Sequence, residues 1–162
     1  MSSVFPAQWF KLAVSVVLCM LAGLIGSFFT TPKISGWYAG INKPSFTPPG
    51  WIFGPVWTAL YVLMGIALYL VWRKGLAAKG VKIALVVFLA QLVLNTLWSY
   101  AFFGAQSPLA GLVVIVALWA MIAASIAAFA PISRAAAALL VPYILWVSFA
   151  LILNTSIYLL NR

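Results

Sequence analysis

Aromatic and amide side chains recur at helical spacing within the apolar segments of this 162-residue chain. Residues separated by three, four and seven positions share one face of a helix. Three such groups are Trp57, Tyr61 and Met64; Asn95, Trp98 and Phe102; and Trp146, Ala150 and Leu153. Each group sets indole, phenol or amide groups into an otherwise apolar surface, which is the composition of a pocket for a hydrophobic small molecule. We therefore expect three helices to line one binding cavity.

The composition excludes most other chemistry. The chain contains nine Lys and Arg residues but no Asp, Glu or His. Carboxylate acid/base catalysis, a Ser/His/Asp triad, a His or carboxylate metal site and an acidic proton relay are therefore excluded. The single Cys19 cannot form an internal disulfide. We expect no metal site and no cofactor.

The two asparagines of the apolar segments allow more than one interpretation. At a rise of ~1.5 Å per residue, Trp57, Asn95 and Asn154 lie about 9–12 Å from one membrane surface. An amide at that depth needs hydrogen-bond partners, so both asparagines should face the bundle interior. Asn95, beside Trp98, is the better candidate for ligand contact, whereas Asn154 is at least as well explained by helix packing. Both could instead bond to each other or to the backbone.

Five charge-free segments are long enough to cross a bilayer, which takes about 20 apolar residues. They run over residues 12–30, 51–72, 83–103, 108–129 and 135–160. With 67% hydrophobic residues and a mean hydropathy of +1.20, the chain predicts an all-α membrane protein, a five-helix bundle forming a single transmembrane domain over residues 1–162. The first segment is longer than the apolar core of a signal peptide and is expected to remain as a helix.

The nine positive charges fit membrane topology better than nucleic-acid binding, because they lie between the apolar segments. Six of them are expected on one side, Lys11, Arg73, Lys74, Lys79, Lys82 and Arg134, and three on the other, Lys33, Lys43 and Arg162. The positive-inside rule then places the N-terminus in the cytoplasm of a prokaryotic plasma membrane. An outer membrane, bacterial or mitochondrial, stays open as an alternative location.

The first connection, residues 31–50, is long and rich in Trp, Tyr, Gly and Pro. Its prolines fix φ and its glycines allow unusual backbone angles, so we expect a compact, non-helical lid over the bundle. The alternative is that Trp37 and Tyr38 only anchor the chain at headgroup depth.

Several short motifs resemble those of the translocator proteins, also called peripheral benzodiazepine receptors or tryptophan-rich sensory proteins. They are Trp37-Tyr38, Asn42-Lys43-Pro44, Thr47-Pro48-Pro49, Gly54-Pro55-Val56-Trp57-Thr58, Leu60-Tyr61, Met64-Gly65, Asn95 with Trp98, Pro142-Tyr143 with Trp146, Phe149-Ala150 and Leu153-Asn154. Each motif is weak alone, but together and in order they make the resemblance specific over nearly the whole chain. Many family members carry acidic residues near the first loop and the C-terminus, which this chain lacks.

The resemblance implies a pocket under the first loop that binds porphyrins, cholesterol-like lipids and benzodiazepine- or isoquinoline-type ligands. It implies ligand contacts at Tyr38, Pro48, Phe53, Trp57, Tyr61, Asn95, Trp98, Trp146 and Ala150. It also implies a homodimer and, through Trp57 and Trp146, light-dependent porphyrin breakdown. A sterol motif of the family is met only loosely, by Leu153, Tyr158 and Arg162, and motifs of this kind arise readily by chance.

Two functional classes remain open at this point. One is a binding protein that senses or transports tetrapyrroles and lipids; the other is an enzyme that degrades protoporphyrin at Trp57 and Trp146. Because the chain has no His to ligate haem iron, a metal-free porphyrin is the simpler ligand. Its propionates would favour Lys33 or Lys43. A third alternative, a structural subunit, predicts a filled interior.

Overall fold

A computed structural model describes residues 4–162, with side chains from Gln8 onward. Its helices are α1 (Val4–Ile34), α2 (Trp37–Gly40), a 3-10 turn (Gly50–Ile52), α3 (Phe53–Trp72), α4 (Val81–Ser99), a π-helical turn (Tyr100–Gly104), α5 (Pro108–Phe129), α6 (Arg134–Leu139) and α7 (Val141–Leu160). The described residues form helices and connecting turns, with no strand.

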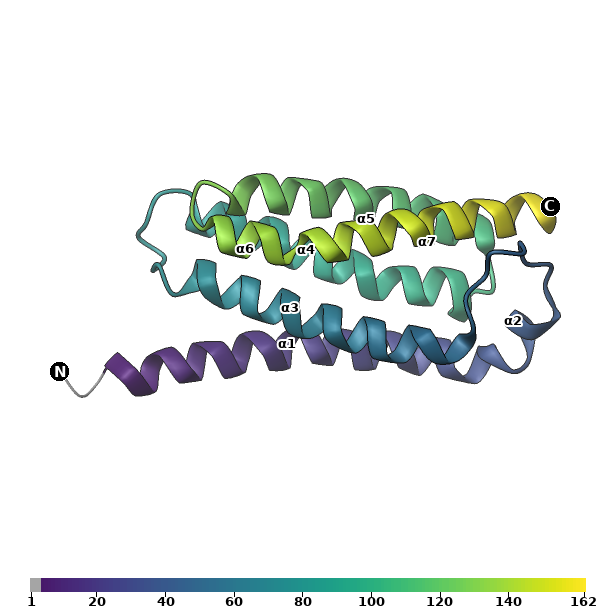
Figure 1. Cartoon of the computed structure of the whole chain (residues 1–162), viewed down its shortest axis with the longest axis horizontal. Helices are drawn as coiled ribbons and strands as arrows, with labels where there is room; N and C mark the ends of the chain where they lie inside the picture. Colours follow the sequence, from purple (N-terminus) through teal and green to yellow (C-terminus); the bar gives the residue numbers. More distant parts are fainter. Residues whose placement is uncertain (1–3) are drawn as a thin grey trace.

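Five of the described segments are long and apolar enough to cross a membrane: Gln8–Ile34, Gly50–Trp72, Val81–Gly104, Pro108–Phe129 and Arg134–Leu160. They run side by side as one elongated bundle, with the start of α1 and the end of α7 at opposite ends of it (Figure 1). The predicted five-helix membrane fold is confirmed.

Each helix of the bundle packs against particular neighbouring helices. α1 packs against α3 and α4, α4 packs against α5, α5 packs against α7, and α6 returns to α3. Two glycines allow the closest contact between α1 and α3. A Cβ atom at Gly65 would lie 2.6 Å from the Val16 Cα, and one at Gly23 would overlap the ring of Tyr61. The small residues of α1 are thus used for packing within the chain.

The main differences from the sequence prediction lie at the end of α1, in the lid and in the fifth span. α1 continues to Ile34, because apolar residues mark the membrane layer and not the end of a helix. The lid was expected to be non-helical, yet Trp37–Gly40 forms the short helix α2. The fifth span divides into α6 and α7 around Leu140, since Pro142 lacks the N–H group that would continue the helix.

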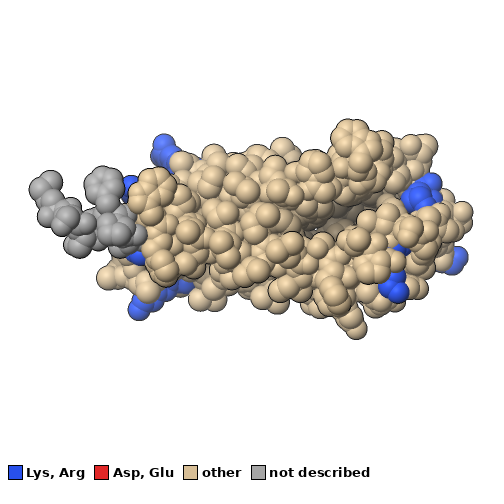
Figure 2. All heavy atoms as spheres, turned by 90° about the horizontal axis from the view of Figure 1, so that it is seen from below, with Lys and Arg blue, Asp and Glu red and all other residues tan. Residues whose placement is uncertain are grey.

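Charge is confined to the two ends of the bundle, and the long middle of the visible face carries no Lys or Arg (Figure 2). Lys33 lies in the last turn of α1 and Arg162 follows α7, both at the lid end. Arg73 follows α3 and Arg134 begins α6 at the other end. This separation is the one that the spacing of the charges predicts.

Candidate functional site

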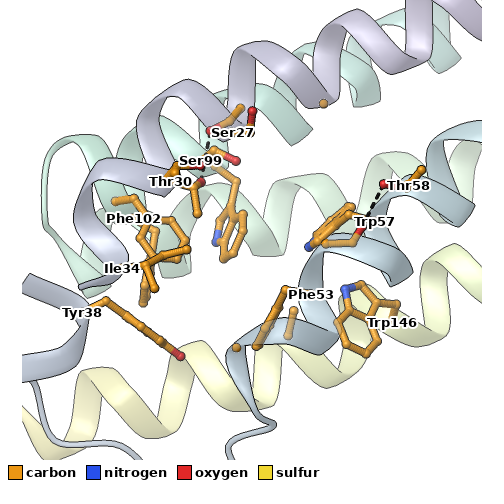
Figure 3. A pocket seen from close by; sticks show the side chains of 18 of the residues that line it. Ser27, Thr30, Ile34, Tyr38, Phe53, Trp57, Thr58, Ser99, Phe102 and Trp146 are labelled. Carbon is orange, nitrogen blue, oxygen red and sulfur yellow. Dashed lines mark hydrogen bonds between the residues drawn. The ribbon is translucent and has the colours of Figure 1, made fainter. Parts of the chain in front are cut away.

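A cavity of about 530 Å³ lies inside the bundle at the lid end. Its volume falls in the range of roughly 300–1,000 Å³ that is typical of small-molecule sites. Its walls come from α1, the lid, α3, α4 with the π turn, and α7 (Figure 3). The lining residues are Met20, Gly23, Leu24, Gly26, Ser27, Thr30, Thr31, Ile34, Tyr38, Gly50, Trp51, Phe53, Gly54, Trp57, Thr58, Tyr61, Trp98, Ser99, Phe102, Phe103, Trp146, Ala150, Leu153, Asn154 and Ile157.

Aromatic rings in contact with one another build most of this wall. The Phe53 and Trp146 rings meet edge to face with centroids 5.8 Å apart. Trp57 stacks on Tyr61 at 5.6 Å, with the ring planes 28° apart. Such contacts hold the rings in fixed orientations and leave broad apolar surfaces toward the cavity. A flat, hydrophobic ligand matches walls of this kind.

Two cavity tryptophans differ in how their indole nitrogens are satisfied. Trp98 Nε1 donates to Asn154 Oδ1 at 3.1 Å, and Asn154 Nδ2 donates to the Pro108 carbonyl at 2.8 Å. Trp146 Nε1 is buried and has no hydrogen-bond partner among the described residues. A buried donor without an acceptor costs about 1–3 kcal/mol. A tryptophan of the cavity wall therefore has an indole donor that no group of the described chain satisfies.

Asn95 lies behind the cavity wall in a buried chain of hydrogen bonds. Tyr61 donates its hydroxyl proton to Asn95 Oδ1. Asn95 Nδ2 donates to the Tyr143 hydroxyl at 2.9 Å, and that hydroxyl donates to Gln91 Oε1 at 2.8 Å. Asn95 is 1% exposed and does not line the cavity. Its amide joins α3, α4 and α7 and fixes the Tyr61 ring that does line it.

The lid is held in shape by Lys43. Its ammonium donates to the carbonyls of Tyr38 at 2.7 Å, Ala39 at 3.2 Å and Ile41 at 2.9 Å. These carbonyls surround the end of α2, where a positive charge is favourable. The ammonium also lies 5.1 Å from the centre of the Tyr38 ring. Burial raises the pKa of the Tyr38 phenol, which therefore stays neutral at physiological pH.

Contacts on two sides fasten the lid to the bundle. Asn42 N donates to Asn161 Oδ1 at 2.9 Å, and Asn161 Nδ2 donates back to the Asn42 carbonyl at 2.9 Å. On the other side, the Trp37 ring meets Phe102 edge to face at 5.5 Å, and Tyr38 lies 5.5 Å from Phe103. The lid is therefore tied to the end of α7 and to the π turn after α4.

The structure brings most of the expected ligand contacts to one cavity. The lining includes Tyr38, Phe53, Trp57, Tyr61, Trp98, Trp146 and Ala150, but not Pro48 or Asn95. Direct ligand contact by Pro48 and Asn95 stays a prediction. Of the loosely matched sterol motif, Leu153 lines the cavity, Tyr158 is half-buried and Arg162 is exposed beyond α7. Sterol recognition by these three residues stays a prediction.

The sequence analysis missed the whole contribution of α1. Gly23, Ser27, Thr30 and Ile34 line the cavity along one face of this helix. Their spacing of four, seven and eleven positions was visible, but small and hydroxylated residues in an apolar helix usually indicate packing. Asn154 also lines the cavity while serving the packing role that its sequence context suggested.

Five membrane-length helices around an aromatic cavity, with a folded lid at one end, define a multi-pass membrane protein with an internal site for a hydrophobic ligand. The chain belongs to the TspO/MBR family, whose model matches residues 15–160.

Relatives of known name cover nearly the full length. The tryptophan-rich protein TspO of Chlorobaculum tepidum is 49% identical over 154 residues, which are 95% of this chain and 98% of the relative. The tryptophan-rich protein TspO of Archaeoglobus fulgidus is 48% identical over 151 residues, which are 93% of this chain and 97% of the relative. The translocator protein of Homo sapiens is 39% identical over 155 residues, which are 94% of this chain and 88% of the relative. The predicted family is confirmed.

Proposed function

We propose that this protein binds a porphyrin or a similarly flat hydrophobic molecule in the aromatic cavity, as a membrane sensor or transporter. The observation that carries the proposal is the Trp146 indole N–H, which is buried beside the cavity without an acceptor among the described residues. A ligand with a ring nitrogen, carbonyl or carboxylate would supply that acceptor, while Phe53, Trp57 and Tyr61 provide apolar contact. Sterol-like lipids and benzodiazepine- or isoquinoline-type compounds meet the same requirement to differing degrees.

The charges of the lid end favour a ligand with acidic groups at its rim. Lys43 is already engaged with three carbonyls of the lid. Lys33 is half-buried in the last turn of α1, close in sequence to Thr31 and Ile34, which line the cavity. We therefore assign a porphyrin propionate to Lys33 and a structural role to Lys43.

Titration with protoporphyrin IX in detergent, followed by quenching of tryptophan fluorescence, tests the proposal. Wild type should show saturable quenching. Trp146→Leu should lose affinity, because it removes the free donor and an aromatic wall. Trp119→Leu is the matched control, since Trp119 is exposed on α5 and donates to Ser148 Oγ at 2.8 Å. Equal affinity of both variants and wild type would reject the site.

A second candidate function is light- or oxygen-dependent degradation of the bound porphyrin. It is favoured by one observation, that Trp57 and Trp146 both line the cavity. Indoles are readily oxidised, and two of them beside a photoexcited ligand could exchange electrons with it. No cofactor or metal is part of either candidate function.

We also propose a prokaryotic plasma-membrane location with the N-terminus in the cytoplasm, and a homodimer. The charge distribution supports the orientation. Ala120 and Ala124 support the dimer, because this pair of small residues is exposed on α5 whereas Gly23 and Gly26 contact Tyr61 and Ser99 within the chain.

A further inference from the structure

The wall of the cavity is closed on one side and open on the other. On α7 and the π turn, the lining residues Phe102, Asn154 and Ile157 are buried. On α1 and α3, lining residues such as Ser27 and Thr58 are exposed. Figure 2 views the molecule from the side of α1 and α3 and shows a hollow near the lid end. The cavity therefore reaches the side of the bundle.

The rim of this opening does not tie α1 to α3. Ser27 Oγ donates to the Leu24 carbonyl at 2.8 Å, and Thr58 Oγ1 donates to the Gly54 carbonyl at 2.9 Å. Both hydroxyls are thus satisfied within their own helices. Gly54 adds no side chain, and a Cβ atom there would meet nothing within 4 Å. The two helices come into close contact one turn further in, where Gly23 meets the Tyr61 ring, and again where Gly65 meets Val16.

The path between the cavity and water is more obstructed. The lid is bonded to α7 through Asn42 and Asn161, and its aromatic residues pack on Phe102 and Phe103. Leaving under the lid would break these contacts. Leaving between α1 and α3 would leave the hydrogen bonds of Ser27 and Thr58 intact, because both lie within their own helices.

The opening also lies at the depth of lipid chains. Ser27 is seven residues before the end of α1 at Ile34, which is about 10 Å at a rise of ~1.5 Å per residue. Headgroups occupy roughly 5–8 Å on each side of a bilayer whose total thickness is about 40–45 Å. With the end of α1 at the outer edge of the headgroups, Ser27 faces acyl chains.

We propose that the cavity exchanges its ligand directly with the bilayer, through the side opening between α1 and α3, and not with water under the lid. This inference rests on the proposed binding of a hydrophobic ligand. The ligand is then a molecule dissolved in the leaflet that surrounds the lid end of the bundle. The lid then acts as a fixed roof that closes the cavity toward water.

Two modifications separate the routes in vesicles that contain the protein and protoporphyrin IX. Ser27→Phe and Thr58→Phe each narrow the side opening. Asn42→Cys with Asn161→Cys, in a Cys19→Ala background, locks the lid to α7 when the two thiols are joined. Ser156→Phe is the control for bulk, because Ser156 Oγ likewise bonds its own helix, at Ile152 O, and Ser156 does not line the cavity. Thermal unfolding checks that every variant is folded.

Release is measured by mixing the vesicles that contain protein and porphyrin with an excess of protein-free vesicles. Tryptophan fluorescence recovers as the porphyrin leaves the protein. We expect Ser27→Phe and Thr58→Phe to slow release and uptake together, each by about tenfold, with a smaller change in Kd. The locked lid and Ser156→Phe should release at the wild-type rate. If the locked lid blocks release and both rim variants release at the wild-type rate, the side route is overturned. The proposed binding of porphyrin in the cavity would still stand. Absence of saturable quenching in wild type would overturn the proposed function and the side route together.

Discussion

The hydroxyl of Tyr61 donates to Asn95 Oδ1, and this bond joins a residue of the cavity wall to a residue that lies behind it. Asn95 in turn donates to the Tyr143 hydroxyl at 2.9 Å, so one amide on α4 orients phenols from α3 and α7. The position of the Tyr61 ring, and with it the stacked ring of Trp57, depends on this amide. Asn95 can therefore influence binding without touching the ligand.

Asn95→Leu should lower both stability and affinity. It leaves two buried hydroxyls with one partner fewer each, at about 1–3 kcal/mol per unsatisfied group, and it frees the Tyr61 ring to turn. We expect a lower midpoint of thermal unfolding in detergent and porphyrin binding weaker by ~1–2 kcal/mol. Tyr61→Phe breaks the same Tyr61–Asn95 bond but leaves the Asn95–Tyr143 bond in place, so it should lower affinity in the same direction with a smaller loss of stability. A loss of affinity at unchanged stability would instead indicate direct ligand contact by Asn95.

Gly65→Ala should destabilise the bundle, because its Cβ atom would lie 2.6 Å from the Val16 Cα and 3.0 Å from the Val16 N. Backbone atoms cannot move aside as a flexible side chain can, so we expect a cost of about 1–3 kcal/mol. Gly40→Ala is the control, since a Cβ atom there meets nothing within 4 Å. Equal unfolding midpoints for the two variants would show that α1 and α3 do not meet backbone to backbone.

The orientation in the membrane is tested by cysteine labelling in a Cys19→Ala background. Gly36→Cys reports on the lid and Ala78→Cys on the loop between α3 and α4. Ala78 is preferred to Gly80, whose φ of 82° disfavours any side chain. We expect a membrane-impermeant thiol reagent to label Gly36→Cys from outside and Ala78→Cys only after the membrane is opened. The reverse pattern would invert the proposed topology.

The parts of the site that could be predicted from sequence are those fixed by spacing along single helices. Trp57 with Tyr61, and Trp146 with Ala150, share helix faces, and both pairs line the cavity. The position of Asn95 could not be read in this way. Its bond to Tyr143 depends on how α4 and α7 pack, and this packing turns the amide away from the cavity. The residues that share a helix face can be predicted from their spacing, but the helix that packs against that face cannot.

The helix ends show a second limit of sequence reasoning. Charge-free apolar segments located the five spans, since hydropathy measures the fit to the bilayer. They did not locate the end of α1 at Ile34, because a helix can continue past the lipid when its backbone remains bonded. The break at Leu140 did have a sequence signal in Pro142, which the hydropathy pattern obscured.

The final prediction separates binding from chemistry at Trp57 and Trp146, which both line the cavity. If the cavity only binds, Trp57→Phe should retain most of the affinity, because a phenyl ring keeps much of the apolar surface. Trp146→Phe also loses the unsatisfied indole N–H and should bind more weakly. If the protein degrades porphyrin, the indole itself is needed, since it gives up an electron to an excited ligand more readily than a phenyl ring does. Trp57→Phe and Trp146→Phe should then bind protoporphyrin IX but slow the loss of its absorbance under light.

Trp119→Phe provides the matched control for these two variants, because Trp119 is exposed on α5 and does not line the cavity. Absorbance is followed in light and in darkness, with porphyrin in empty micelles as the background rate. Degradation by the protein requires that wild type and Trp119→Phe bleach porphyrin faster than empty micelles, and that the two cavity variants fall toward the micelle rate. If all samples bleach at the same rate, the protein does not degrade porphyrin, and Trp57 and Trp146 take part in binding alone.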